Sequence, residues 1–160
     1  MKTKRLTAAL LIVATVIVAF SFLSPKSEYY EKNKKFKYAY FPYYSTLNNP
    51  LSEKDKSEAE KILSEAKEVF TFIGEKEPEK DVGELKRYYR ISPDIVDIQL
   101  DIEAVAGDFT GKNGYLWVIY SVTRLDETGN TSSGSWDILT YWKVKNIDGE
   151  WKVVKIKEAA

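Results

Sequence analysis

The chain has 160 residues, which is enough for one domain and a targeting segment but not for two ordinary domains. Its 24 basic and 24 acidic residues cancel, and without Lys2, Lys4 and Arg5 the chain has 21 basic and 24 acidic residues, a net charge of −3. Binding to nucleic acid depends on a basic field, so we expect no nucleic-acid partner. The sequence has no Cys and no His, which excludes disulfides, thiol nucleophiles, His-based triads and the usual zinc sites.

The N-terminus has the pattern of a membrane anchor. A basic start precedes an uncharged, mostly apolar run of 18 residues from Leu6 to Leu23. At about 1.5 Å per residue this run just spans a hydrocarbon core of roughly 30 Å, and it exceeds the core of a typical signal peptide. We therefore expect residues 1–24 to be a transmembrane anchor, with a signal peptide cleaved after Ser21 as the alternative. Either way, the charge bias predicts a cytoplasmic N-terminus and a domain outside the membrane or secreted.

Residues 25–49 begin as a polar, charged linker and become strongly aromatic. Phe36, Tyr38 and Tyr40 alternate with lysine or alanine, and a period of two predicts a strand, which Pro42 then breaks. We interpret residues 36–44 as an edge strand or extended arm that lies on the domain and covers apolar surface. Two alternatives stay open: a binding patch for a partner, wall glycan or lipid head group, and a role at the membrane surface.

A helix is expected after residue 52. Ser52 is a good N-cap and Asp55 follows three residues later, which is close to a capping box. Apolar residues recur every three or four positions until Gly74, which is expected to end the helix. A loop and a short second helix over residues 82–89 should follow. The apolar positions of the first helix are Ala59, Ile62, Leu63, Ala66, Val69, Phe70 and Ile73.

From residue 92 onward the pattern is typical of strands. Residues 97–104 alternate strictly, residues 115–125 are rich in aromatic and β-branched types, and two further strands are expected over residues 135–146 and 150–158. The predicted connections are a turn at Asn113–Gly114, a loop over 126–134 and a tight hairpin at Asp148–Gly149. The predicted class is α+β: an N-terminal transmembrane or signal helix, then a domain over residues 50–160 with one long helix packed on a curved antiparallel meander sheet of about four strands.

The C-terminal third contains a "WKV" strand, a D-G turn and a closing "WKVVKI" strand. This order resembles the closing hairpins of small exported bacterial domains in the nuclear-transport-factor-2-like (cystatin-like) superfamily. The resemblance implies a cone of helices capped by a curved sheet, with a pocket between them. Because the superfamily usually opens with a longer helical region, we expect the pocket here to be shallow or filled by side chains.

Asp97, Gln99, Asp101 and Glu103 form an acidic row on the first predicted strand. Alternate residues of a strand lie roughly 6.7 Å apart, so Asp97 and Asp101 are about 13 Å apart. One divalent cation needs ligand oxygens about 2.0–2.6 Å away, which the whole row cannot supply. We therefore predict no metal site and no cofactor, and interpret the row as a solvated face that pairs with lysines on the adjacent strand.

Aromatic residues dominate the candidate ligand or partner site. On the third predicted strand, Trp136, Ile138, Trp142 and Val144 should point to one face, whereas Leu139 and Tyr141 should point to the other. The first face is expected to pack on the long helix, or to line a ligand pocket. The second face is expected to be a dimer surface or to hold the N-terminal strand. The candidate set is Trp117, Tyr120, Trp136, Tyr141, Trp142 and Trp151.

Three functions are compatible with these patterns. We expect a non-catalytic domain, held at the membrane through Leu6–Leu23, that binds a small ligand, a protein partner or a second copy of the chain. The alternative is an assembly scaffold of a secretion or conjugation-type envelope complex. A lesser alternative is a pocket enzyme, which without His would need a carboxylate base of raised pKa or a Tyr.

Overall fold

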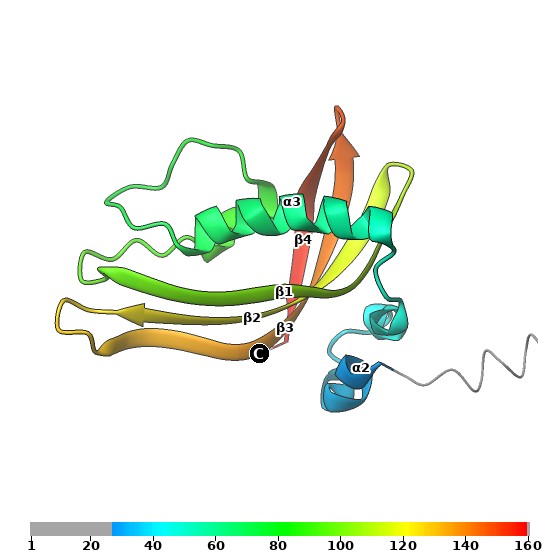
Figure 1. Ribbon diagram of the computed structural model, residues 1–160, viewed down its shortest axis with the longest axis horizontal. Coiled ribbons are helices and arrows are strands. Elements are labelled where there is room, and N and C mark those ends of the chain that lie inside the picture. The colour runs from blue at the N-terminus through cyan, green and yellow to red at the C-terminus, as the bar shows by residue number, and fades with distance from the viewer. Residues whose placement is uncertain (1–26, 160) are drawn as a thin grey trace, which may run out of the picture.

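The structure, a computed structural model, describes residues 27–159. The predicted anchor or signal segment, residues 1–24, lies outside the described residues. Among residues 27–159, no helix has the length and apolar character needed to cross a membrane. These residues form a four-stranded antiparallel sheet with one long helix packed on it (Figure 1), which confirms the predicted α+β class.

The sheet is a meander whose strands pair in chain order: β1 (Asp97–Thr110), β2 (Asn113–Leu125), β3 (Thr131–Ile147) and β4 (Glu150–Glu158). The predicted turn at Asn113–Gly114 is wrong, because Thr110 pairs with Asn113 and the turn is Gly111–Lys112. Gly111 has a φ of 62°, which suits the first position of a type II′ turn. The strand β3 begins at Thr131, so part of the predicted 126–134 loop is strand. The hairpin at Asp148–Gly149 is confirmed, with φ of 53° and 92°.

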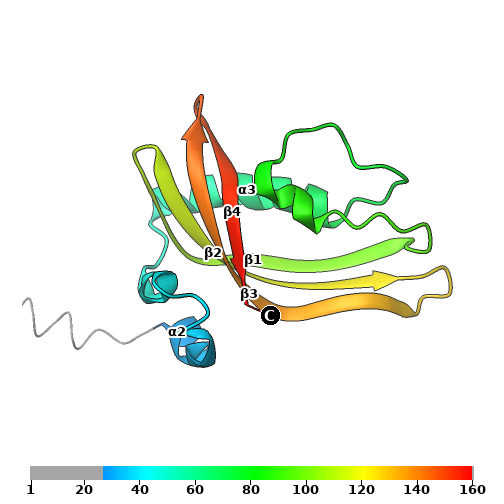
Figure 2. The same cartoon turned by 180° about the vertical axis from the view of Figure 1, so that it is seen from behind.

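The sheet bends strongly around the helix, as Figures 1 and 2 show. Each strand pair contains a register shift. The extra residue lies in β1 between Ala104 and Ala106, in β3 opposite Tyr120 and Val122, and in β4 opposite Lys143 and Val144. An extra residue in one strand of a pair bends that strand and increases its twist. The bulges therefore give the sheet a concave inner face, which holds the helix.

The long helix is α3 (Glu53–Phe70). The Ser52 hydroxyl accepts a hydrogen bond from the Asp55 backbone N–H at 3.2 Å, which confirms the predicted N-cap. The predicted end at Gly74 is wrong, because α3 ends at Phe70 with Thr71 as its C-cap. The Phe72 N–H donates at 3.4 Å to the Val69 carbonyl, three residues back, so the α-helical bonding pattern stops there. The predicted second helix is a 3₁₀ helix, η3 (Gly83–Tyr88).

The inner core lies between α3, η3 and the concave face of the sheet. It is densely apolar, so side chains fill the space in which the family resemblance implies a pocket. Its buried members include Ala59, Ile62, Ala66, Val69, Phe70, Leu85, Leu116, Val118, Val122, Trp142, Val144 and Val153.

The N-terminal segment, residues 27–49, is helical and not a strand. It comprises α2 (Glu28–Lys32), η1 (Lys34–Phe36) and η2 (Tyr43–Asn48). The predicted strand over residues 36–44 is therefore wrong. The backbone hydrogen bonds of residues 36–44 are local. The Tyr40 N–H donates to the Phe36 carbonyl at 3.1 Å, and the Tyr43 N–H donates to the Tyr40 carbonyl at 2.8 Å. The alternation of aromatic residues with lysine or alanine has the period of a strand, but here it belongs to helical turns.

The N-terminal segment nevertheless covers apolar surface, as expected. Its Tyr40, Tyr44 and Leu47 are buried against Trp117 and Leu139 on the outer face of the sheet, and we call this cluster the outer core. The Tyr40 hydroxyl donates to the Leu139 carbonyl and accepts from the Ala159 N–H at 3.0 Å. The sheet is thus sandwiched between α3 on one face and the N-terminal segment on the other.

Candidate functional site

The six aromatic residues predicted as a site lie on both faces of the sheet. Tyr120 and Trp142 are buried in the inner core, and Trp151 packs against it. Trp117 and Tyr141 are buried in the outer core. The structure therefore does not bring the six residues into one pocket.

Trp136 does not share the core face of Ile138 and Trp142, contrary to the prediction, and is 61% exposed. The reason is a bulge: Ile138 pairs with Tyr120 whereas Ser135 pairs with Val122, so β3 has an extra residue at this point. Asp137 within the bulge has a φ of 53°. An extra residue shifts the strand's alternation, and the indole therefore lies outside the core.

The acidic row of β1 is exposed, as expected. The prediction that it pairs with lysines on the adjacent strand is wrong. Opposite Asp97, Gln99, Asp101 and Glu103 on β2 stand Leu125, Thr123, Ser121 and Ile119. Glu103 instead accepts a hydrogen bond at 2.6 Å from the Tyr29 hydroxyl of the N-terminal segment. This bond to the carboxylate, together with desolvation, raises the pKa of Tyr29 to about 12. Within residues 27–159, no group of three acidic side chains is arranged to hold a metal ion.

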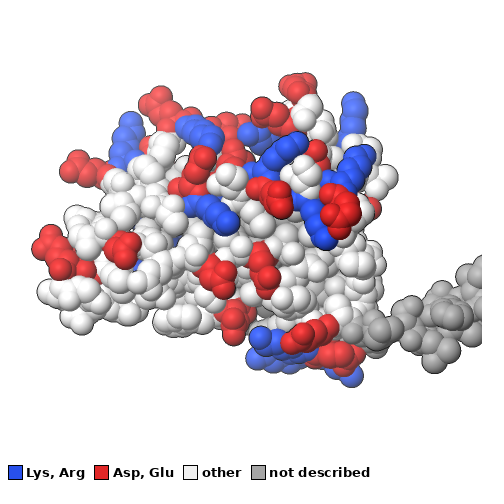
Figure 3. Space-filling view, in the orientation of Figure 1, with Lys and Arg blue, Asp and Glu red and all other residues white. Residues whose placement is uncertain are grey.

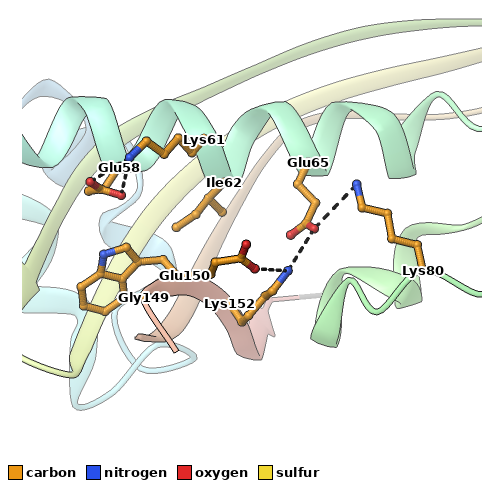
Figure 4. Close-up of a pocket in the computed structure, with 9 residues that line it drawn as sticks. Glu58, Lys61, Ile62, Glu65, Lys80, Gly149, Glu150 and Lys152 are labelled. Carbon is orange, nitrogen blue, oxygen red and sulfur yellow. Dashed lines mark hydrogen bonds and ion pairs between the residues drawn. The ribbon is translucent and has the colours of Figure 1, made fainter. Parts of the chain in front are cut away.

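A groove of about 430 Å³ lies between α3 and the β3–β4 hairpin (Figure 4). Its charges pair with one another. The Lys152 ammonium lies 3.4 Å from Glu65 and 3.5 Å from Glu150, and Lys80 lies 2.8 Å from Glu68 and 3.9 Å from Glu65. These ion pairs satisfy the groove's own charges, so it lacks an unmatched group that would select a ligand.

A second, smaller pocket contains charges that are not matched. It lies at the C-terminal end of α3, where the inner face of β2 meets the start of β3, and has a volume of about 170 Å³. Its polar lining consists of two arginines, two tyrosines and two serines: Arg90, Arg124, Tyr88, Tyr120, Ser133 and Ser135. We call it the arginine pocket.

The position of Arg124 follows from the alternation of β2. Leu116, Val118, Tyr120 and Val122 face the inner core, and Arg124 is the next residue in that row. It pairs with Ser133 on β3, and it is only 6% exposed. The strand pairing therefore holds a guanidinium group at the edge of an apolar core.

Arg124 has no counter-ion among the described residues. Its buried Nε has no hydrogen-bond partner there, and no ion pair in the described chain involves an arginine. Burial lowers the pKa of Arg124, and the positive charge of Arg90 lowers it further. Arg90 donates to the backbone carbonyls of Arg87 and Tyr89, both at 3.2 Å. Two cations thus share a small pocket in which no carboxylate is a lining residue.

The end of α3 compensates only part of this charge. Phe70, its last residue, lines the arginine pocket, and the C-terminus of a helix favours cations by about 0.3–1 kcal/mol. An ion buried without a partner costs several kcal/mol. The difference leaves a strong local preference for an added negative charge.

The two tyrosines act as walls and not as bases. The Tyr88 and Tyr120 hydroxyls donate to the Glu158 carboxylate of β4, at 3.1 and 3.3 Å. Burial, followed by the charge of Glu158, raises the pKa of both tyrosines. Both are therefore protonated at neutral pH. The free donors of the pocket are the guanidinium groups and the serine hydroxyls, which suit an anion.

Sequence reasoning identified Tyr120 but missed Arg124, Arg90 and Tyr88. A signal for Arg124 was present, because the apolar row at 116, 118, 120 and 122 continues at position 124. Arg90 and Tyr88 come from η3 and the loop after it, whose place beside β2 no periodicity predicts.

Comparisons with family models, curated proteins and solved structures found no match for this chain.

Proposed function

We propose that this chain is a non-catalytic, membrane-anchored extracytoplasmic domain that binds a small oxyanion in the arginine pocket. The oxyanion is a carboxylate, phosphate or sulfate group, the class that a guanidinium recognises with two parallel N–H···O bonds. The location rests on the sequence prediction for Leu6–Leu23.

The buried Nε–H of Arg124, which has no partner among the described residues, is the observation that carries this proposal. The exposure of Arg124 is only 6%. Hydrogen bonds to charged groups contribute about 1.5–3 kcal/mol each. An oxyanion that accepted from Arg124 would gain such bonds and would also remove the cost of burying the cation alone.

The size of the pocket limits the ligand. At about 30 Å³ per water molecule in the liquid, a volume of about 170 Å³ holds the bulk of five or six waters. A short carboxylate or a single phosphate or sulfate group fits this volume, whereas a nucleotide or an oligosaccharide does not.

The lining also supports binding without catalysis. A general base must accept a proton near neutral pH. The pocket's tyrosines have raised pKa values, and its serines have no basic partner among the lining residues. The lining therefore provides donors to hold an anion but no group to activate a nucleophile.

Isothermal titration calorimetry with sodium acetate and sodium phosphate, at constant ionic strength set with sodium chloride, tests the proposal. We expect saturable binding of at least one of these anions to the wild-type chain and none to Arg124→Met. Arg87→Met is the matched control, because Arg87 donates to the Ile156 carbonyl and does not line the pocket; it should bind as wild type does. Equal binding by the Arg124 variant, or no binding of either anion, would overturn the proposal.

The scaffold alternative gains no comparable support. The sheet face of Leu139 and Tyr141 was expected to be a dimer surface or to hold the N-terminal strand. Tyr141 is buried, and Tyr43 of the N-terminal segment stacks on it with ring centroids 4.4 Å apart. The chain's own segment therefore occupies that part of the face.

A further inference from the structure

The N-terminal segment exposes two large aromatic side chains that the outer core does not use. Tyr38 is 89% exposed and Phe41 is 73% exposed. They lie in one turn between η1 and η2, in which the Phe41 N–H donates to the Tyr38 carbonyl at 3.3 Å. Their neighbours Tyr40 and Tyr44 are buried against the sheet, so the segment has one face on the domain and one in solvent.

Lysines surround the exposed aromatic pair. Lys34, Lys35 and Lys37 are all exposed. Residues 27–49 carry four lysines and two glutamates, a net charge of +2, whereas residues 50–160 carry 16 basic and 22 acidic residues, a net charge of −6. In Figure 3 the lysines and glutamates of the segment form a cluster at the lower edge of the molecule, apart from the charged surface around α3.

The covalent connection keeps this segment close to the predicted span. The Ser27 N–H donates to the Asn48 side chain at 3.0 Å and its hydroxyl donates to the Leu47 carbonyl at 3.1 Å, so the chain's entry into the domain is fixed on η2. The predicted span ends at Leu23. The four residues from Leu23 to Ser27 reach at most about 14 Å, at about 3.3–3.6 Å per residue.

Some face of the domain must therefore lie near the lipid head groups, which extend about 5–8 Å beyond the hydrocarbon core on each side. Aromatic rings favour that zone, and lysines favour anionic lipid. The acidic body of the domain is repelled by the same lipid. Only the N-terminal segment, among the described residues, combines exposed aromatics with a net positive charge.

We propose that the turn with Tyr38 and Phe41, together with Lys34, Lys35 and Lys37, docks on an anionic lipid surface and orients the domain with the arginine pocket away from the membrane. This inference goes beyond anion binding and rests on the membrane attachment included in the proposed function. The occupant is the lipid surface and not a protein partner.

Lipid-quenching fluorescence on the whole chain in liposomes tests the proposal. The chain has no Cys, so Ala39→Cys gives a single labelling site that keeps both aromatics. Glu127→Cys is the control, because it lies in the β2–β3 loop at the other end of the long axis (Figure 1). We expect lipids with a nitroxide on the head group to quench a fluorophore at position 39 and not at 127, in liposomes that contain phosphatidylglycerol.

Two variants separate the contributions. One variant removes the aromatics and the other removes the charges: Tyr38→Ser with Phe41→Ser, and Lys34→Gln with Lys35→Gln and Lys37→Gln. Each variant should lose most of the quenching at position 39 while the chain stays on the liposomes. Flotation is measured first. A chain that stays in the aqueous phase overturns the membrane attachment and this inference with it, whereas a floated chain with equal quenching at 39 and 127 overturns the docking alone.

Discussion

Replacing Arg124 with Met should stabilise the chain in a buffer that contains no oxyanion. The substitution keeps an unbranched side chain and removes the positive charge of a residue that is 6% exposed and whose Nε has no partner among the described residues. Replacing buried ionic groups with apolar residues of similar volume is often neutral or stabilising by about 1–4 kcal/mol. The favourable effect of the helix terminus, about 0.3–1 kcal/mol, is lost. We therefore expect a net gain of about 1–3 kcal/mol in the free energy of unfolding.

Urea denaturation at 25 °C in sodium chloride measures this gain. The same denaturation in acetate or phosphate measures how much the bound anion stabilises each chain. At a ligand concentration of about 100 times its Kd, the wild-type chain should gain about 2.7 kcal/mol and Arg124→Met should gain nothing. Arg87→Met should stay within about 0.5 kcal/mol of wild type in both buffers. A loss of stability at Arg124→Met without oxyanion would refute the reasoning, because it would mean that the protein itself already compensates the guanidinium.

Three further predictions concern the packing of the fold. Leu47→Ala should destabilise the chain by about 2–4 kcal/mol in urea, as should Ile62→Ala in the inner core, because both side chains are buried; a loss near zero at Leu47 would show that the N-terminal segment is not part of the cooperative unit. Gly83→Ala should cost about 2–4 kcal/mol, since φ is +59° and the added Cβ would lie 2.5 Å from the Val153 carbonyl oxygen. Gly129→Ala, with φ of +79° but open space, should cost only about 1–2 kcal/mol, and equal losses would contradict the close-contact argument. Burial, followed by the neighbouring Tyr43 and Tyr115, raises the pKa of Tyr141 to about 12. Between pH 10 and 12 the folded chain therefore keeps a proton that the unfolded chain releases. The free energy of unfolding consequently falls as pH rises. Tyr141→Phe should make that fall shallower by up to about 1.4 kcal/mol per pH unit, and an unchanged slope in urea titrations at pH 9–11.5 would count against it.

Periodicity predicted the elements that bury one face along a regular strand or helix. The helix from Ser52, the meander order and the opposite faces of Trp142 and Tyr141 all follow from spacing, and the structure confirms them. Errors occurred where one local contact outweighs the pattern. The helix α3 ends before Gly74, where the Phe72 N–H bonds to the Val69 carbonyl three residues back, and a bulge at Asp137 exposes Trp136.

The aromatic N-terminal segment shows a different limit. Alternation at Phe36, Tyr38 and Tyr40 fits a strand, but the same residues fit helical turns that place Tyr40 in a core and leave Tyr38 in solvent. The contact with Trp117 and Leu139 on the outer face of the sheet, which Tyr40 helps to bury, decides between the strand and the helical turns. Tertiary contact of this kind is not encoded in a local window of sequence.

The candidate site was less predictable than the fold, because its arginines come from separate elements. Strand alternation alone would have placed Arg124 on the inner face. Whether a cation there is paired depends on what η3 and the start of β3 bring beside it. The register of β2 with β3, including its bulge, determines that these neighbours are Ser133 and Ser135 and not an acidic residue.

The most direct test of anion binding is the nuclear magnetic resonance signal of the Arg124 Nε–H during an acetate titration at constant ionic strength. The chain has four arginines, at positions 5, 87, 90 and 124, so the side-chain spectrum is sparse and the Arg124→Met spectrum assigns the signal. The proposed function predicts that the Arg124 signal shifts saturably in the acetate titration or in a matching phosphate titration. The Arg87 signal should change little in both. Signals that all move together and without saturation in both titrations would contradict it.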